Sequence, residues 1–166
     1  MNNTGESTHI HLESSNEEES RSLFQFISFK CGQTTYGLPL FGTREIVHVP
    51  HLTFLPAAPS FVRGIFNWRG HIVCVIDLLE WLGLSGKETQ NLNPKKCVIV
   101  MNTPKEGIGL IADGLNGIVT IPSSRLESAP EALGSASRKT VSSIARYRDQ
   151  IIPLLNLESF SSLGIT

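Results

Sequence analysis

Between residues 62 and 82 the order of apolar and polar positions predicts two strands, a tight turn and a short helix. Apolar and polar side chains alternate over residues 62–68, which is the pattern of a strand with one buried face. Gly70 marks the turn, and the unbroken apolar run 72–76 is typical of a strand that is covered on both faces. Asp77 then predicts the N-cap of a short helix.

The same pattern returns further along the chain. Residues 62–81 match residues 141–160 at an offset of 79, so that Arg69 falls on Arg148. Upstream, residues 46–50 match residues 118–122 at an offset of 72. Agreement in order over the whole stretch is unlikely by coincidence, and we therefore expect two copies of one five-stranded unit. The expected strands are 23–30, 35–40, 62–68, 72–76, 96–101, 108–113, 115–121, 141–147 and 151–155, with 42–49 ambiguous between helix and strand.

The expected fold class is mainly β, because many short strands separated by Gly and Pro turns indicate small barrels rather than a parallel sheet. Residues 1–22 are polar and acidic and predict a disordered tail. The folded part is then a single domain over residues 23–163. A linker rich in Gly, Ser, Asn and Lys at 83–94 divides it into subdomain one, about 23–82, and subdomain two, about 95–163.

Composition narrows the class of protein. The chain has 166 residues, 40% of them hydrophobic and 17% charged, which describes a soluble globular protein. No apolar run approaches the ~20 residues that span a bilayer, and no secretion signal is present, so we expect a cytoplasmic protein without membrane insertion. The three cysteines, Cys31, Cys74 and Cys97, fit reduced thiols that fill the core. The net charge of −1 does not predict nucleic-acid binding.

Candidate chemistry is sparse. His48 and His51, and His71 and Cys74, have the spacing of metal ligands. Each pair lies in strand-like sequence, where residues three apart point to opposite faces, whereas a tetrahedral site needs side chains that converge. We therefore expect no metal. The sequence has no GxSxG motif and no glycine-rich phosphate loop, so neither a catalytic nucleophile nor a cofactor is indicated.

Polar residues at one strand end are more informative. Arg63, Asn67 and Arg69 share the polar side of a strand that otherwise feeds the core, and Arg69 sits at the tight turn. Its counterpart Arg148 lacks the neighbouring Asn and Gly. The simplest interpretation is a solvated arginine at a hairpin end. A duplicated unit that differs at one turn also suggests a single specialised contact surface.

Several motifs at fixed spacing extend over about 23–163 and identify a family. By these motifs the chain resembles the CheW family of chemotaxis coupling proteins. They are Tyr36-Gly37-Leu38-Pro39, Arg44-Glu45-Ile46, Val62-x-Gly64-Ile65-x-Asn67-x-Arg69-Gly70, Ile72-Val73-x-Val75-Ile76-Asp77-Leu78 and Gly109-Leu110-Ile111-x-Asp113.

The resemblance implies two five-stranded SH3-like barrels with a groove between them. It also implies a non-catalytic adaptor without a cofactor. Such proteins join the cytoplasmic helical hairpin of chemoreceptors to the regulatory domain of a CheA-type histidine kinase, which is itself CheW-like. The expected location is the cytoplasm, at receptor arrays on the inner membrane.

The resemblance also assigns residues. The receptor-binding arginine of the family falls on Arg69 and its neighbouring glutamate on Glu45. Thr43 stands at a groove-facing position where valine is common, and Asn67 lies beside Arg69, so both join the expected receptor site. The glycine region that contacts the kinase falls on Gly64, with Arg63 next to it.

Two alternatives from other classes of protein remain open at this point. One is a peptide- or small-ligand-binding β-barrel unconnected to kinases. The other is an enzyme that uses Asp113 and His71. Trp68, where the family commonly has an aliphatic residue, is a departure from the pattern.

Overall fold

The computed structural model describes residues 22–84, 95–103, 107–131 and 133–161, and shows a mainly β fold with short helices. This confirms the predicted fold class. The α-helices are α2 (Leu78–Trp81), α3 (Ser135–Thr140) and α4 (Leu157–Ser161), and the 3-10 turns are η1 (Leu40–Gly42) and η2 (Ser123–Arg125). The strands are β1 (Leu23–Cys31), β2 (Thr34–Pro39), β3 (Thr43–His48), β4 (Val62–Trp68), β5 (His71–Asp77), β6 (Cys97–Met101), β7 (Ile108–Ala112), β8 (Gly114–Pro122), β9 (Leu126–Ser128), β10 (Val141–Tyr147) and β11 (Gln150–Leu155).

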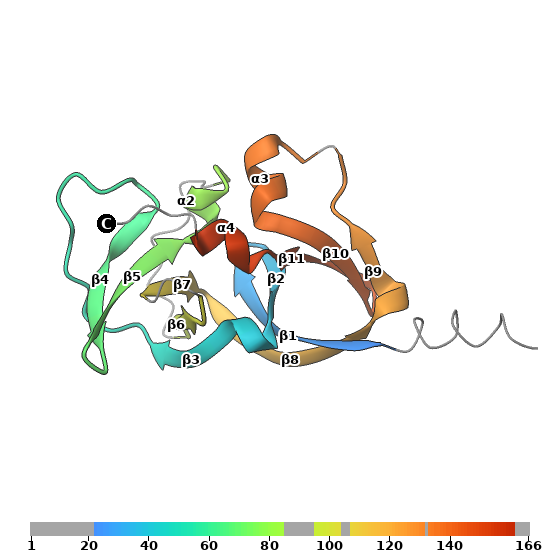
Figure 1. Ribbon diagram of the computed structural model, residues 1–166, viewed down its shortest axis with the longest axis horizontal. Helices are drawn as coiled ribbons and strands as arrows, with labels where there is room; N and C mark the ends of the chain where they lie inside the picture. Colours follow the sequence, from blue (N-terminus) through green and yellow to red (C-terminus); the bar gives the residue numbers. More distant parts are fainter. Residues whose placement is uncertain (1–21, 85–94, 104–106, 132, 162–166) are drawn as a thin grey trace, which may run out of the picture.

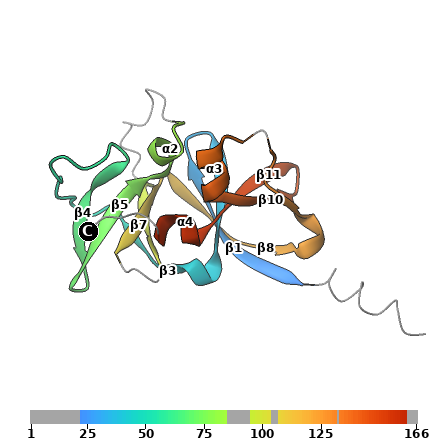
Figure 2. The same ribbon diagram turned by 45° about the horizontal axis from the view of Figure 1, so that its top comes forward.

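The strands form two sheets that lie side by side (Figure 1). The six-stranded sheet has the order β8-β1-β2-β11-β10-β9, and the five-stranded sheet has the order β3-β6-β7-β5-β4. Neighbouring strands are antiparallel except for two parallel pairs, β2 with β11 and β5 with β7. Figure 2 shows β4, β5 and β7 on one side of the molecule, with β10 and β11 on the other.

The sheets do not correspond to the expected subdomains 23–82 and 95–163. Strands β1 and β2, from the first half of the chain, pair with β8 and β11 from the second half. Strands β6 and β7, from the second half, pair with β3 and β5 from the first half. Each sheet therefore takes strands from both halves. The sequence does not reveal this exchange, because the two copies of a strand carry the same pattern and either copy suits the same neighbours.

The repeat itself is confirmed by the register of the strands. In the β3–β6 pair a bulge precedes Glu45, which lies opposite Val100. In the β1–β8 pair the register shifts at the equivalent place, where Gly117 lies opposite Ser28. Five strands of the six-stranded sheet thus match the five-stranded sheet one for one, and β9 is the addition.

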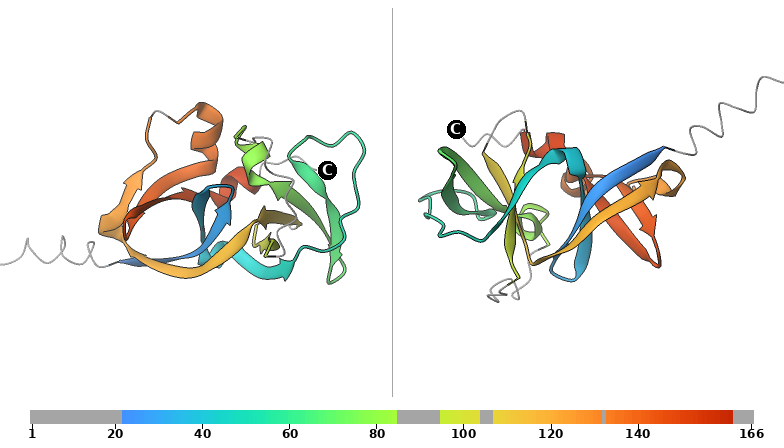
Figure 3. Two further views of the ribbon diagram at one scale, coloured as in Figure 1. Left: turned by 180° about the vertical axis from the view of Figure 1, so that it is seen from behind. Right: turned by 90° about the horizontal axis from the view of Figure 1, so that it is seen from below.

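Both sheets are strongly curved (Figure 3). Within the described residues, however, no pair of edge strands forms the backbone ladder that would close either sheet. The SH3-like barrels expected from the resemblance are therefore present here as two curled sheets with open edges.

One hydrophobic core joins the two sheets. Its fully buried side chains come from strands of both sheets and from α2 and α4, which cover it. One smaller hydrophobic cluster lies inside each curved sheet. Gly37 and Gly109, which are equivalent in the repeat, allow close packing, because an added Cβ would lie 2.6 Å from Leu154 and from Val98 respectively. The main core contains Phe29, Leu38, Ile76, Ile99, Met101, Leu110, Leu155 and Phe160.

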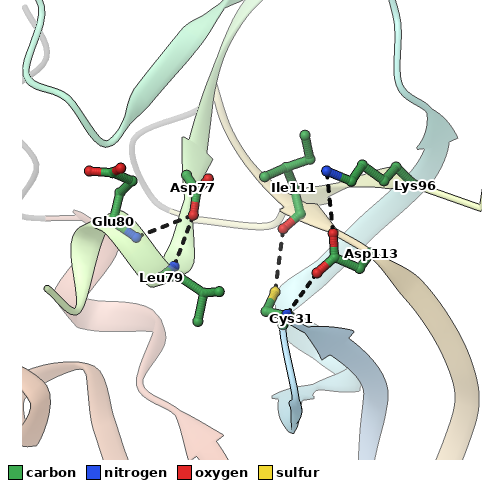
Figure 4. A network of polar contacts seen from close by, with 8 residues as sticks. Cys31, Asp77, Leu79, Glu80, Lys96, Ile111 and Asp113 are labelled. Carbon is green, nitrogen blue, oxygen red and sulfur yellow. Dashed lines mark hydrogen bonds and ion pairs between the residues drawn. The ribbon is translucent and has the colours of Figure 1, made fainter. Parts of the chain in front are cut away.

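A polar network ties the sheets together beside this core (Figure 4). Asp113, between β7 and β8, accepts a hydrogen bond from the backbone of Gly32 at 2.7 Å and pairs with Lys96 at 3.4 Å. Its own amide donates to the carbonyl of Lys30 at 2.8 Å. Asp113 is thus a structural link between the β1–β2 turn and the other sheet.

Helix caps and thiols follow the sequence predictions. The Oδ1 atom of Asp77 accepts hydrogen bonds from the amides of Leu79 and Glu80, so Asp77 is the N-cap of α2. Cys31, Cys74 and Cys97 are free and buried. Burial raises the pKa of all three thiols above the ordinary value, and the charge of Asp113 raises the pKa of Cys31 further. The thiols therefore stay protonated at neutral pH.

Two expectations concern parts of the chain outside the described residues. The acidic tail predicted at 1–22 lies outside them except for Ser22, and so does the linker after Leu84. Among the helices of the described part, none is long and apolar enough to cross a membrane.

Candidate functional site

The turn between β4 and β5 holds Arg69 in an unusual backbone conformation. Arg69 and Gly70 form a two-residue turn with φ of 51° and 87°, as in a type I′ hairpin. The left-handed conformation costs a non-glycine residue roughly 1 kcal/mol. The side chain of Asn67 offsets part of this cost, because its Oδ1 accepts a hydrogen bond from the Gly70 amide at 2.8 Å. Asn67 and Gly70 therefore fix the direction in which Arg69 projects.

Trp68 is the platform on which Arg69 rests. The guanidinium carbon of Arg69 lies 5.5 Å from the Trp68 ring centroid, within cation–π range. The Trp68 Nε1 donates a hydrogen bond to Glu45 Oε2 at 3.0 Å, and Arg69 Nη2 lies 2.9 Å from the same oxygen. Arg44, in the bulge of β3, lies 5.9 Å from the ring. We call Arg44, Glu45, Trp68 and Arg69 the Arg69 cluster.

The cluster exists because the five-stranded sheet curls. Glu45 lies on β3 and Trp68 on β4, and these are the two edge strands of that sheet. Their side chains meet through the hydrogen bond from Trp68 to Glu45, so side chains join the edges where no backbone ladder does. Trp68 also packs against the cluster of Phe66, Val73 and Val98 inside the curl. Core packing thus sets the position of the platform.

The charges of the cluster orient a cation more than they stabilise the fold. The side chain of Arg69 is 71% exposed and that of Glu45 is 33% exposed. Ion pairs with this exposure contribute only about 0–1 kcal/mol to stability. The guanidinium has five N–H donors, and most of them face solvent in a fixed orientation. The arrangement suits recognition of a carboxylate or of backbone carbonyls on another molecule.

Two exposed apolar side chains lie on the elements that carry the cluster. Ile72, which pairs with Asn67 across the hairpin, is 60% exposed. Phe41 is 76% exposed, and its carbonyl accepts a hydrogen bond from Asn102, which in turn accepts one from Arg44. Exposed apolar groups together with an arginine are typical of the composition of an interface.

The structure places Thr43 less clearly with the other expected receptor-site residues. It begins β3, two positions before Glu45 and across the bulge. Its side chain is half-buried, and its Oγ1 is enclosed without a hydrogen-bond partner in the described part of the chain. Among the described residues no hydrogen bond or ion pair joins it to Arg69. The structure thus brings Arg69, Glu45 and Asn67 together and leaves Thr43 beside them.

The two expected kinase-site residues lie at the other end of β4. Arg63 is exposed there, and five residues of strand, roughly 16 Å, separate it from Trp68. Gly64 is buried with φ of 142°, and an added Cβ would lie 2.8 Å from the Thr53 carbonyl oxygen. The backbones of Thr53 and Ile65 exchange two hydrogen bonds at this point, of 2.8 and 2.9 Å. Gly64 therefore lets the segment around Thr53 lie against β4.

The residues of the enzyme alternative are separated. His71 starts β5 beside Trp68, whereas Asp113 lines a small pocket with Asp77, at the far end of β5 about 20 Å away. Asp113 is also engaged with Gly32 and Lys96. Within the described residues, no group of three or more His, Cys, Asp or Glu side chains lies close enough to hold a metal ion.

Sequence reasoning missed the role of Trp68. The residue reads as the last apolar position of a strand, and its contact with Glu45 depends on the curl of the whole sheet. One signal was available, because an aromatic residue precedes the arginine in both copies of the repeat, as Trp68-Arg69 and as Tyr147-Arg148.

Comparison with known proteins agrees with the family resemblance and with the fold. Residues 25–163 match the family model described as CheW-like domain. The chain is 29% identical to chemotaxis protein CheW of Helicobacter pylori, over 87% of this chain and 85% of that one. It is 28% identical to protein FrzA of Myxococcus xanthus, over 87% and 88% of the two chains. The crystal structure of the scaffolding protein TtCheW from Thermoanaerobacter tengcongensis superposes with a TM-score of 0.73, at 26% identity, covering 82% of this chain and 90% of that one.

The hydrogen bond between Trp68 and Glu45 can be tested by a double-mutant cycle. Trp68→Phe keeps the aromatic face but removes the Nε1–H donor, and we expect the free energy of unfolding to fall by about 1 kcal/mol. In the Glu45→Ala background the same substitution should cost clearly less, because the acceptor is already gone. Urea unfolding of the four proteins measures the coupling. Additive effects of the two substitutions would contradict the contact.

Proposed function

The chain belongs to the CheW family, and we propose that it is a non-catalytic adaptor that couples chemoreceptors to a CheA-type histidine kinase. In this role one surface binds the cytoplasmic helical hairpin of the receptor. A second surface binds the regulatory domain of the kinase. The observation that carries the proposal is the Arg69 cluster, which holds an exposed guanidinium against Trp68 and Glu45.

The receptor side is proposed at this cluster. Arg69 lies on Trp68 and is held by Glu45, so little side-chain entropy is lost when a partner binds it. Its free donors suit carboxylates on a helix or the carbonyls at a helix C-terminus. Ile72 on β5 and Phe41 in η1 are exposed and could add apolar area to the contact. Thr43 completes the proposed site at the start of β3.

The kinase side is proposed at the other end of β4. There Gly64 lets the segment at Leu52 and Thr53 lie against the strand. The next residue, Phe54, is 74% exposed. A partner that contacts Phe54 and Arg63 would therefore depend on Gly64, although the glycine itself is buried. The proposed partner is the kinase regulatory domain, which in this family is itself CheW-like.

The two proposed surfaces are separate, because the length of β4 divides them. An adaptor of this design can hold both partners at once. The proposed location is the cytoplasmic face of the inner membrane, where receptor hairpins and kinase assemble into arrays, with the adaptor held there by its partners.

Substitution of Arg69 tests the receptor side. Arg69→Ala should weaken binding of the receptor's cytoplasmic hairpin by about 2 kcal/mol, as truncation of a central interface arginine does. The fold should be kept, because the side chain is 71% exposed. Titration calorimetry with the purified hairpin measures the change. Arg125→Ala, at an exposed arginine in η2, is the matched control and should bind normally. Equal affinity of both variants would remove Arg69 from the site.

Substitution of Gly64 tests the kinase side. Gly64→Ala adds one Cβ that would lie 2.8 Å from the Thr53 carbonyl oxygen, at a φ that L side chains rarely adopt. We expect the segment at Thr53 to move and kinase-domain affinity to fall about tenfold or more, while hairpin binding persists. The control is Gly114→Ala, where the added carbon meets no described atom within 4 Å. Normal kinase affinity in Gly64→Ala, measured by calorimetry, would refute this assignment.

A further inference from the structure

The six-stranded sheet repeats the Arg69 turn of the five-stranded sheet. At the tip of the β10–β11 hairpin, Arg148 has φ of 52°, against 51° for Arg69. Its guanidinium carbon lies 5.3 Å from the ring centroid of Tyr147, which packs inside the six-stranded sheet as Trp68 packs inside the other. Ile151 is 57% exposed, like its equivalent Ile72 at 60%. The cation, its platform and the apolar neighbour are therefore all present twice.

The carboxylate is present only once. In strand register, Gly117 takes the place of Glu45, since each follows the bulge of its edge strand. Gly117 has φ of 111°, and a side-chain carbon built there would meet no described atom within 4 Å. Among the described residues Arg148 has no ion pair, and its guanidinium lies over the ring of Tyr147. The second turn thus has the cation of the first without its anion.

A pocket lies where the missing side chain would be. It has a volume of about 630 Å³ and is lined by Ser28, Lys30, Thr35, Asn116, Tyr147 and Arg148, among others. Asn116 and Ile118, which flank Gly117, both border it. Ser28 is almost fully buried at 2% exposure, and its hydroxyl accepts a hydrogen bond from Asn116 at 3.5 Å. The volume is that of an ordinary ligand site.

We propose that this pocket binds a glutamate or aspartate side chain of an acidic peptide segment from another protein. The bound carboxylate would take the place that Glu45 occupies in the five-stranded sheet. The carboxylate pairs with Arg148, and Lys30 adds a second cation at the wall. This interaction is separate from the receptor and kinase contacts proposed above.

The charge and the apolar lining of the pocket favour a single carboxylate carried by a peptide. Lys30 and Arg148 give two positive charges, and Asp149, which also lines the pocket, removes one. The net charge of +1 suits a single carboxylate better than a polyanion such as nucleic acid. Ile118, 58% exposed on the pocket wall, offers an apolar contact that a peptide can use and an inorganic anion cannot.

The test is an NMR titration of the full chain with a blocked pentapeptide that carries one glutamate between two leucines. We expect saturable shifts of the Gly117 amide and the Arg148 side-chain Nε–H. A peptide with glutamine in place of glutamate should bind about tenfold more weakly, because it lacks the charge. Arg148→Ala should lower the affinity for the glutamate peptide about tenfold. Arg125→Ala, which removes an exposed arginine outside the pocket, should leave it unchanged.

Four results would overturn the proposal. Equal binding of the two peptides would exclude the carboxylate, and unchanged binding in Arg148→Ala would exclude the pocket. Equal affinity for free N-acetylglutamate would show a small-molecule site instead of a peptide site. Shifts of Gly117 and Arg148 on deletion of residues 1–21, without added peptide, would show that a carboxylate of this chain occupies the pocket.

Discussion

Backbone pairing between the two halves of the chain is the constraint on which the structure depends. The β1–β8 and β3–β6 ladders and the parallel pairs β2–β11 and β5–β7 all join a strand of one half to a strand of the other. Each sheet therefore needs strands from both halves of the chain to be complete. The main core lies between the sheets and draws on both, so burial of its apolar side chains and formation of the cross-half ladders are one event.

This pairing also positions the surfaces that could bind partners. Strands β6 and β7, from the second half, separate β3 from β5 and β4 in the five-stranded sheet and set the curl that brings Glu45 to Trp68. The equivalent curl in the other sheet brings Arg148 beside the strand that carries Gly117. The same curl therefore yields two turns with an arginine stacked on an aromatic ring. The residue at one position, Glu45 or Gly117, decides whether that arginine has a carboxylate partner within the chain.

Much of the fold was predictable, because strand boundaries follow local patterns. The β4–β5 hairpin, the Asp77 cap and the second copy at β10–β11 all appear where alternation and turn residues place them. The exchange of strands was not predictable, since equivalent strands have equivalent patterns. Motif spacing singled out Arg69, Glu45 and Asn67, which the structure places near one another. The platform role of Trp68 was missed, because the contact joins edge strands that only the curled sheet brings together.

Separate production of residues 1–84 and 95–166, followed by amide hydrogen exchange on each fragment and on their mixture, tests the cross-half pairing most directly. The account predicts that neither fragment alone protects its strand amides. It further predicts that the mixture protects the amides of the β1–β8 and β3–β6 ladders. If residues 1–84 alone protected β1 to β5 as a cooperative unit, each half would fold as its own barrel, and the account would be wrong.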